Sequence, residues 1–460
     1  MKENKTKRSY EIDMCSGPLF SKIVLFALPL MASGVLQLLF NAADIIVVGR
    51  FAGSQSMAAV GSNGALINLM VNVFIGLSIG ANVLVARYYG ARDEKNLEET
   101  VHTAMVIAVV GGLLLIAIGE LLTKPILILM GSPEDVLPLA VLYMKIYFLG
   151  MPGTLVYNFG SAILRAVGDT RRPLYFLLTA GVVNVIFNLI FVIAFSMDVA
   201  GVGWATVISQ GVSGLLCLFY MKKKFTVLKM QGDEWRPHKH SMMMLCGMGI
   251  PMGLQYSITA IGSVILQTAV NTLGSVAVAS VTAGGKIGTF FCCPFDAMGA
   301  TMATYGGQNV GAKKLDRISR GLRECVLLGA IYSVIAFVVI YFFSDVIALL
   351  FVDASETEIL HNTRTFLLAN VSFYFPLALV NIVRFMIQGL GYSRLAILAG
   401  VCEMIARSAV AFWLVPVLGY DGACLANPAA WIAADLFLIP AYLHVMKHLK
   451  YVVFSSKDVA

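Results

Sequence analysis

Twelve long apolar segments follow one another along the 460-residue chain, and they constrain its fold more than any other feature. A helix needs about 20 mostly apolar residues to cross the hydrocarbon core of a bilayer. The segments lie at residues 20–48, 57–86, 101–122, 137–163, 173–196, 200–221, 242–270, 277–305, 322–343, 360–388, 395–417 and 423–446. A membrane β-barrel would instead need alternating segments of about ten residues. We therefore expect an all-α polytopic membrane protein with twelve transmembrane helices.

The composition excludes the common soluble classes. Residues of the AVILMFWYC set make up 58% of the chain and charged residues only 13%, whereas soluble chains average about 45–50% and about 25%. So few charges cannot keep this much apolar surface dissolved in water. A soluble enzyme, a disordered protein and a nucleic-acid-binding module are therefore excluded, and we expect the lipid bilayer to be the solvent.

The positions of Lys and Arg predict the orientation in the membrane. If the N-terminus is cytoplasmic, 25 of the 33 Lys and Arg residues lie on the cytoplasmic side of the expected helices. Only Arg50 and Lys124 lie on the other side, and the remaining six fall within or at the ends of the apolar segments. Positive charge is retained on the cytoplasmic side of membrane proteins. We expect a multi-pass protein of the cell membrane with both termini in the cytoplasm.

The two halves of the chain resemble each other at an offset of 221 to 223 residues. The matching pairs are Leu28–Leu30 with Ile250–Met252, Gly90–Arg92 with Gly311–Lys313, and Gly168 with Gly391. Six helices separate the copies, so both copies enter the membrane in the same direction. We expect two pseudo-symmetric six-helix lobes at 20–221 and 242–446, a connector at 222–241, and cytoplasmic tails at 1–19 and 447–460. Duplicated bundles of this kind are typical of alternating-access transporters.

Asp44 is the leading functional candidate because a charge in mid-membrane costs at least about 2.5–3.5 kcal/mol. It lies fifteen residues after Pro29, and Gln37 and Asn41 precede it by seven and three positions on one helical face. Burial among apolar groups favours the protonated form of a carboxyl. Asp44 could therefore exchange protons near neutral pH, supply negative charge to Na⁺, or form a structural bond to a neighbouring helix.

Polar residues of the next helices could complete a site around that carboxylate. Asn184 and Asn188 are four residues apart on one helical face, and the helices before and after theirs carry Asn158 and Thr206. Amide and hydroxyl oxygens can bind a hard cation or form hydrogen bonds. Each residue alone would more often form hydrogen bonds that hold helices together, and spacing does not establish that the four converge.

The second half carries a different set of charged and polar residues whose transfer into a membrane costs free energy. Glu403 and Arg407 are four residues apart and could form a structural ion pair or face a cavity. Arg384 has no acid near it in sequence, so we expect it to use Glu403 or Asp435. The remaining residues that could line a substrate cavity are Gln255, Gln267 and Gln388.

The chain resembles the multidrug and toxic compound extrusion (MATE) family of secondary transporters. The resemblance rests on ALPLMASGVLQLLFNAADIIVVGRFAG, RYYGARDEKNLEE, ILRAVGDTRRP, NVIFNLIFV and GVGWATVISQ, in this order along the chain, with weaker echoes in the second half. It implies two six-helix lobes that alternate between inward-open and outward-open states while proton or sodium entry drives export.

The resemblance also implies a site in the first lobe. By matching motif, the cation or proton site consists of Asp44, Asn158, Asn184, Asn188 and Thr206, with Gln37 and Tyr143 nearby and Pro29 as the bending point. Many relatives have an aspartate where Asn188 stands, so the resemblance leaves open whether H⁺ or Na⁺ is the coupling ion. The acids that another subfamily carries in its seventh and tenth helices are absent, which argues against a coupling site in the second lobe.

The sequence thus predicts a cation-coupled antiporter that exports organic, often cationic or amphipathic, compounds and needs no cofactor. We expect a monomer whose partners are a small-molecule substrate and the lipid bilayer. The cavity residues in this prediction are Gln37, Asn41, Tyr143, Gln255, Gln267, Arg384, Gln388, Glu403 and Arg407. A flippase of a lipid-linked precursor is the alternative. A channel or a membrane-embedded enzyme is disfavoured because the sequence has neither a filter-like loop nor a catalytic cluster.

Overall fold

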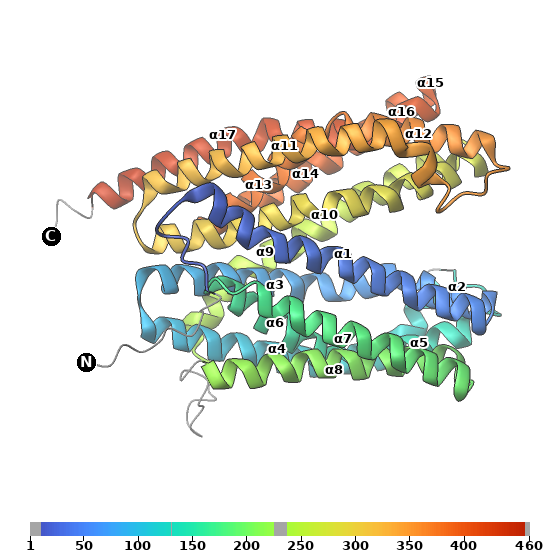
Figure 1. Ribbon diagram of the computed structural model, residues 1–460, viewed down its shortest axis with the longest axis horizontal. Helices are drawn as coiled ribbons and strands as arrows, with labels where there is room; N and C mark the ends of the chain where they lie inside the picture. The colour runs from blue at the N-terminus through green and yellow to red at the C-terminus, as the bar shows by residue number, and fades with distance from the viewer. Residues whose placement is uncertain (1–10, 130, 225–236, 456–460) are drawn as a thin grey trace. The chain divides into compact units, whose positions relative to one another are not determined.

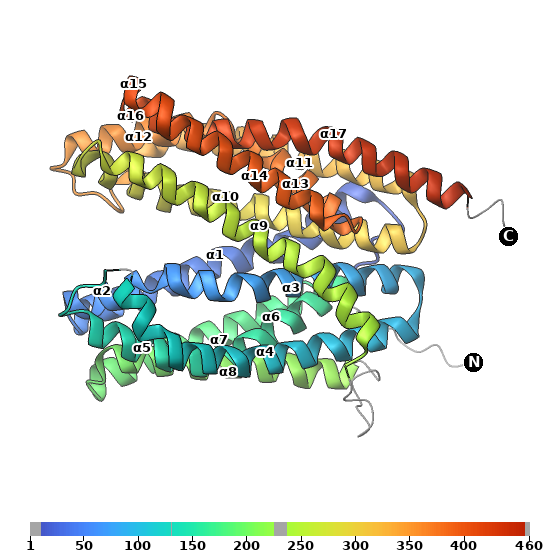
Figure 2. The same cartoon turned by 180° about the vertical axis from the view of Figure 1, so that it is seen from behind.

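The computed structural model describes residues 11–129, 131–224 and 237–455, and every regular element in these ranges is a helix (Figures 1 and 2). Parts of the expected tails 1–19 and 447–460 and of the expected connector 222–241 lie outside the described residues. The prediction of an all-α fold is confirmed for the part of the chain that the structure describes.

The first half of the chain forms eight α-helices and one short π-helix. Their bounds are α1 (Leu19–Phe51), α2 (Ser54–Ser62), α3 (Gly64–Ala91), α4 (Glu94–Leu129), α5 (Leu137–Leu149), α6 (Met151–Ala166), α7 (Arg171–Leu189), the π-helix η1 (Ile190–Ala194) and α8 (Asp198–Lys224). The helix α9 (Lys239–Asn271) begins the second half.

The second half continues with eight further α-helices and another π-helix. They are α10 (Ser275–Gly311), α11 (Leu315–Ala348), α12 (Thr357–Val371), α13 (Tyr374–Gly389), α14 (Ser393–Ala409), the π-helix η3 (Val410–Leu414), α15 (Val415–Leu418), α16 (Tyr420–Cys424) and α17 (Ala426–Ser455).

Ten of the described helical segments are long and apolar enough to cross a bilayer, and two bent pairs bring the number to twelve. The bent pairs are α5 with α6 and α12 with α13, and each pair bends by 50°. Pro152 and Pro376 lie near the starts of α6 and α13. Because proline lacks the N–H that would continue the helix, both breaks have the same cause. The twelve expected spans are therefore found, the fourth and tenth as broken helices.

The internal repeat is present in the backbone as well as in the sequence. Positive φ angles recur at Gly53 (98°) and Gly274 (99°), at Arg92 and Lys313 (57° each), and at Gly168 (97°) and Gly391 (96°). The π-helices η1 and η3 follow α7 and α14, which are the fifth spans of the two copies. Turns and helix distortions thus recur at the sequence offset, and the predicted internal repeat is confirmed.

By their internal contacts, the described residues form two compact units. The described residues up to Asp13 and from Ala32 to Ile250 belong to unit 1, and those from Met14 to Met31 and from Pro251 onward belong to unit 2. The expected lobe bounds 20–221 and 242–446 stay a prediction. The two units depart from these bounds within two helices, α1 and α9. The first half of α1 packs within unit 2, and the beginning of α9 packs within unit 1. Both helices pass from one unit to the other beside a proline, Pro29 or Pro251.

Small residues allow close helix packing within each unit. A Cβ added to Gly214 of α8 would lie 2.8 Å from the carbonyl oxygen of Gly153 in α6. In unit 2, a Cβ added to Gly389 of α13 would lie 2.5 Å from the carbonyl oxygen of Ala303 in α10. Helices in lipid gain little from the hydrophobic effect when they associate, so close backbone approach supplies much of their packing energy.

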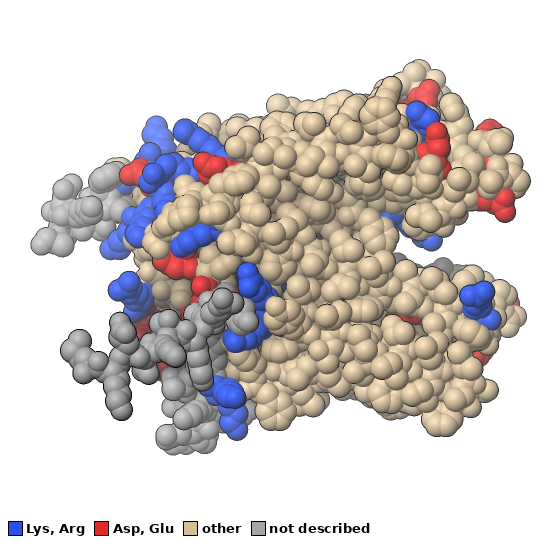
Figure 3. Space-filling model, viewed as in Figure 1, with Lys and Arg blue, Asp and Glu red and all other residues tan. Residues whose placement is uncertain are grey.

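The surface of each unit matches a lipid solvent. Large apolar side chains remain exposed along the spans, for example Leu121 (74%) and Phe219 (70%) in unit 1 and Phe342 (70%) and Leu436 (73%) in unit 2. Figure 3 shows an extensive uncharged surface, with Lys and Arg gathered mainly toward one end of each unit. The arrangement confirms the sequence prediction of a multi-pass membrane protein.

Candidate functional site

The position of Asp44 in unit 1 depends on how α1 packs against α7. Phe40 and Asp44 are one helical turn apart on α1, and Gly181 lies under the ring of Phe40. A Cβ added to Gly181 would overlap this ring. Asn184 and Asn188 follow Gly181 on the same face of α7. The missing side chain of Gly181 therefore allows α1 close enough for Asp44 to accept a hydrogen bond from Asn188.

A chain of hydrogen bonds joins Asp44 to α8 through two asparagines. The amide nitrogen Nδ2 of Asn188 donates to Oδ1 of Asp44 at 2.5 Å and to Oδ1 of Asn184 at 3.0 Å. Asn184 Nδ2 donates in turn to the hydroxyl of Thr206 at 3.5 Å. That hydroxyl donates to the carbonyl oxygen of Val202 at 3.0 Å. Residues of three helices that the sequence could not connect thus form one polar group.

This polar group is set among apolar and aromatic residues. Asn188, Asn184 and Thr206 are only 0%, 6% and 9% exposed, and Asn188 Oδ1 has no hydrogen-bond partner among the described residues. Tyr143 and Tyr147 of α5 lie near enough to Asp44 for its charge to act on their hydroxyl groups. Asp44 therefore sits in a site where gain or loss of one charge has a large energetic effect.

Three of the expected first-lobe residues lie apart from this hydrogen-bond chain. The described contacts do not connect the half-buried side chain of Asn158 to Asp44. Gln37 and Asn41 share a helical face with Asp44 but are exposed. Their assignment to the ion site or to a cavity therefore remains a prediction.

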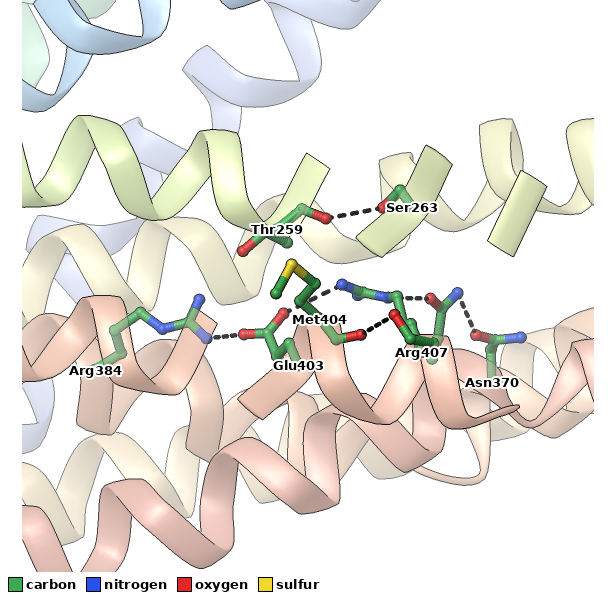
Figure 4. Close-up of polar contacts among 9 residues, drawn as sticks. Thr259, Ser263, Asn370, Arg384, Glu403, Met404 and Arg407 are labelled. Atoms are coloured by element: carbon green, nitrogen blue, oxygen red, sulfur yellow. Dashed lines mark hydrogen bonds and ion pairs between the residues drawn. The ribbon is translucent and has the colours of Figure 1, made fainter. Parts of the chain in front are cut away.

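A second polar group lies buried in unit 2 and centres on Glu403 of α14. Arg384 of α13 donates through Nη2 to Glu403 Oε1, and Arg407 Nη1 lies 3.5 Å from Glu403 Oε2 (Figure 4). Arg407 Nε also donates to Asn427 Oδ1 at 3.4 Å, and Asn427 Nδ2 donates to Asn370 Oδ1 at 3.1 Å. Of the two acids expected for Arg384, Glu403 is the one bonded to it, and it also binds the arginine on its own helix.

The other polar residues expected to line a cavity in unit 2 divide into two kinds. Gln388 Nε2 donates to Gln255 Oε1 at 2.8 Å, and both side chains are buried. Gln267 is exposed and donates to Asn271 of its own helix at 2.9 Å. Only the first pair joins two helices, α9 and α13.

Sequence reasoning missed three members of the unit 2 group. Asp296 of α10 and Asp435 of α17 both interact electrostatically with Arg384, but only Asp435 had been considered. An acid inside the apolar segment 277–305 was a sufficient signal for Asp296. Asn370 and Asn427 gave no comparable signal, because a single amide in a membrane helix is common.

No group of three or more His, Cys, Asp or Glu side chains in the described ranges is arranged to hold a metal ion. The chemistry of the Asp44 group is therefore that of one carboxylate with amide and hydroxyl neighbours. Such a group can bind a proton, or a cation that accepts oxygen ligands.

Comparison with known proteins agrees with the repeat and the fold. The MatE family model matches this chain twice, at residues 29–190 and 251–413. The Bacillus subtilis (strain 168) protein named "Probable multidrug resistance protein YoeA" is 28% identical over 340 residues, which cover 72% of this chain and 73% of that protein. From the same organism, "Probable multidrug resistance protein YpnP" is 26% identical over 407 residues, which cover 88% of each chain.

A solved structure has the same fold over almost the whole length. It is described as the outward-facing conformation of a multidrug resistance MATE family transporter of the MOP superfamily, and it matches with a TM-score of 0.90 at 20% identity. The match covers 97% of this chain and 100% of that chain. With both halves matched by the family model, this chain belongs to the MatE family of membrane transporters.

Proposed function

We propose that the protein is a cation-coupled antiporter that exports organic, often cationic or amphipathic, compounds by alternating access. The observation that carries this proposal is the membrane-embedded carboxylate of Asp44, bonded to Asn188 and lined by Asn184 and Thr206. The names of YoeA and YpnP as probable multidrug resistance proteins support the class of substrate.

In the proposed cycle, neutralisation of the charge on Asp44 supplies the free energy that drives the change between the two states of the transporter. An ionised carboxylate at this depth costs several kcal/mol, and binding of a proton or a cation removes much of that cost. The proposed cycle requires the free energy of neutralisation to differ between the two states of the transporter, because only a differential affinity shifts a conformational equilibrium. In this proposal α1 bends at Pro29, which lies inside the same helix as Asp44.

Of the two candidate coupling ions, the contacts favour H⁺. A sodium ion needs several oxygen ligands, whereas Asn188 presents its Nδ2 donor to Asp44. With Nδ2 directed at Asp44, the nearest amide supplies a hydrogen-bond donor in place of a ligand oxygen. Protonation of Asp44 needs no additional ligand, so the group as arranged can bind a proton with little rearrangement.

The distribution of charge supports the proposed orientation in the cell membrane. In unit 2, exposed Lys314, Arg320 and Lys447 lie at the end that carries the α10–α11 turn and the last turns of α17. The opposite end of unit 2 carries exposed acids, including Asp353 and Glu358. Because positive charge is retained in the cytoplasm, we propose that both termini lie inside and that the protein works as a monomer.

For the remaining expected cavity residues, burial suggests a division of roles. Gln37, Asn41 and Gln267 are exposed, and we propose that they contact the substrate. Arg384, Glu403 and Arg407 are buried and bonded to one another. We therefore propose that these three hold unit 2 together.

The test is efflux of a fluorescent organic cation from proteoliposomes under separate proton and sodium gradients. We expect the parent to export the dye under the proton gradient and Asp44→Asn to lose this gradient-driven transport. Asp421→Asn, which removes an exposed acid outside the site, is the matched control and should transport like the parent. Undiminished gradient-driven efflux by Asp44→Asn would exclude Asp44 as the coupling carboxylate.

A further inference from the structure

Four consecutive backbone carbonyl groups before α1 accept hydrogen bonds from side chains around the α10–α11 turn. All of these residues belong to unit 2. Arg317 donates to Met14 (3.1 Å), Ser16 (2.7 Å) and Gly17 (3.0 Å), Lys314 donates to Cys15 (2.8 Å), and Asn309 donates to Met14 (3.2 Å). The backbone N–H of Met14 donates to Gln308 Oε1 at 3.2 Å. We call the segment Met14–Gly17 and these four side chains the N-terminal clamp.

Two of the clamp side chains and Met14, the residue they bind, are deeply buried. Gln308 and Asn309 are completely buried, and Met14 is 1% exposed. Asn309 Nδ2 also donates to the carbonyl of Tyr305 at 2.9 Å, and the Tyr305 hydroxyl donates to the carbonyl of Arg317 at 2.5 Å. The planar guanidinium of Arg317 reaches three of the carbonyl acceptors at once, which a lysine ammonium cannot do in the same geometry.

The clamp fixes the beginning of a helix that serves both units. The first half of α1 packs in unit 2, where Ile23, Phe26 and Ala27 are completely buried. The second half packs in unit 1 and carries Asp44, and the change of unit falls between Met31 and Ala32. One continuous helix, with Pro29 inside it near the change of unit, therefore connects the Asp44 group to unit 2.

The second copy of the repeat has a similar arrangement before α9. The backbone N–H of His238 donates to Thr103 Oγ1 of α4 at 3.3 Å. A Cβ added to Gly249 of α9 would lie 2.5 Å from the Cα of Leu77 in α3. These contacts lie in unit 1, and α9 continues into unit 2 at Pro251. Each crossing helix is thus anchored at its start to the second and third spans of the other repeat.

We propose that Arg317 is a positioning residue for transport, which makes the first half of α1 move together with unit 2. Loss of the clamp would let this half of α1 follow unit 1, so a change at Asp44 would no longer be transmitted to unit 2. The inference rests on the proposed coupling role of Asp44, but it adds residues that lie outside both polar groups of the membrane interior.

The experiment compares Arg317→Ala, Arg317→Lys and the control Arg320→Ala, which removes an exposed arginine one turn along α11. Hydrogen–deuterium exchange of the full-length protein reports on the clamp, and dye efflux from proteoliposomes reports on transport. We expect Arg317→Ala to accelerate exchange in Met14–Met31 and to lower the turnover rate by about tenfold, with little change in KM. Arg317→Lys should restore part of the turnover, and Arg320→Ala should match the parent in both measurements.

Two outcomes would overturn the role of Arg317. Unchanged exchange in Met14–Met31 would mean that the clamp does not hold α1, and faster exchange with normal turnover would mean that the clamp does not serve transport. Efflux by Asp44→Asn, measured in parallel, separates this result from the proposed function. If Asp44→Asn loses transport and Arg317→Ala retains it, the coupling role of Asp44 stands and the role of Arg317 is rejected.

Discussion

The ring of Phe40 on α1 lies directly over Gly181 on α7, so that no side chain could be added to the glycine without moving the ring. In the second repeat the glycine lies on the first span instead of the fifth. A Cβ added to Gly262 on α9 would lie 3.1 Å from the Cα of Met404 on α14. In each copy the first span approaches the fifth across one glycine. In unit 1 this approach brings Asp44 to Asn188.

Gly181→Ala should therefore separate α1 from α7 and impair transport. Overpacking of a close contact costs about 1–3 kcal/mol, and we expect a lower melting temperature together with slower dye efflux. Gly211→Ala is the matched control, because Gly211 lies within α8 and a Cβ there would meet no atom within 4 Å. A Gly181→Ala variant as stable and active as Gly211→Ala would show that the contact does not position Asp44.

Asn188→Asp should increase the response to sodium. The substitution places a second carboxylate where an amide now donates to Asp44, and two adjacent carboxylates repel each other unless a proton or a cation lies between them. We expect a sodium gradient at clamped pH to drive efflux several times faster in the variant than in the parent. Asn188→Leu, which supplies no oxygen, should show no sodium response. An equal response of all three proteins would contradict a direct role of residue 188 in ion binding.

Glu403→Gln should destabilise unit 2. The substitution leaves two buried arginines without the carboxylate that pairs with them, and removal of one partner from a buried ion pair costs about 3–5 kcal/mol. We expect low yield and a lower melting temperature in detergent. Glu358→Gln, at an exposed position of α12, is the control. Normal stability of Glu403→Gln combined with altered transport would instead assign Glu403 to a substrate cavity.

The turn before α4 should contribute a pH-dependent part of the stability. Hydrogen bonds from the side chain and the backbone N–H of Asn96 lower the pKa of Asp93 below its ordinary value of 3.8. A lowered pKa in the folded state stabilises the protein above pH 3.8, and this contribution is lost as the pH falls through the folded-state pKa. The melting temperature of Asp93→Ala should thus lie below that of the parent at pH 7, with a smaller difference at pH 3. An equal difference at both values would contradict the assignment.

The sequence by itself determined the solvent, the spans, the repeat and the candidate acid. Apolar length is a local property, so twelve spans could be predicted without knowledge of any contact between them. The repeat could be predicted because turns that need positive φ, such as Gly168 and Gly391, recur at a fixed offset. Asp44 was identifiable because a carboxylate within a span is costly wherever the helix lies.

Only the tertiary structure decided which polar residues meet. Helical periodicity gives the face of a residue but not the helix opposite that face, so Asn188 could be bonded to Asp44 while Asn158 stayed apart. For the same reason the sequence could not decide whether Arg384 pairs with Glu403 or Asp435. The packing of α13 against α14 brings Arg384 to Glu403. The anchoring of Met14–Gly17 to Arg317 joins residues about 300 positions apart, and backbone carbonyls carry no sequence signal from which that contact could be predicted.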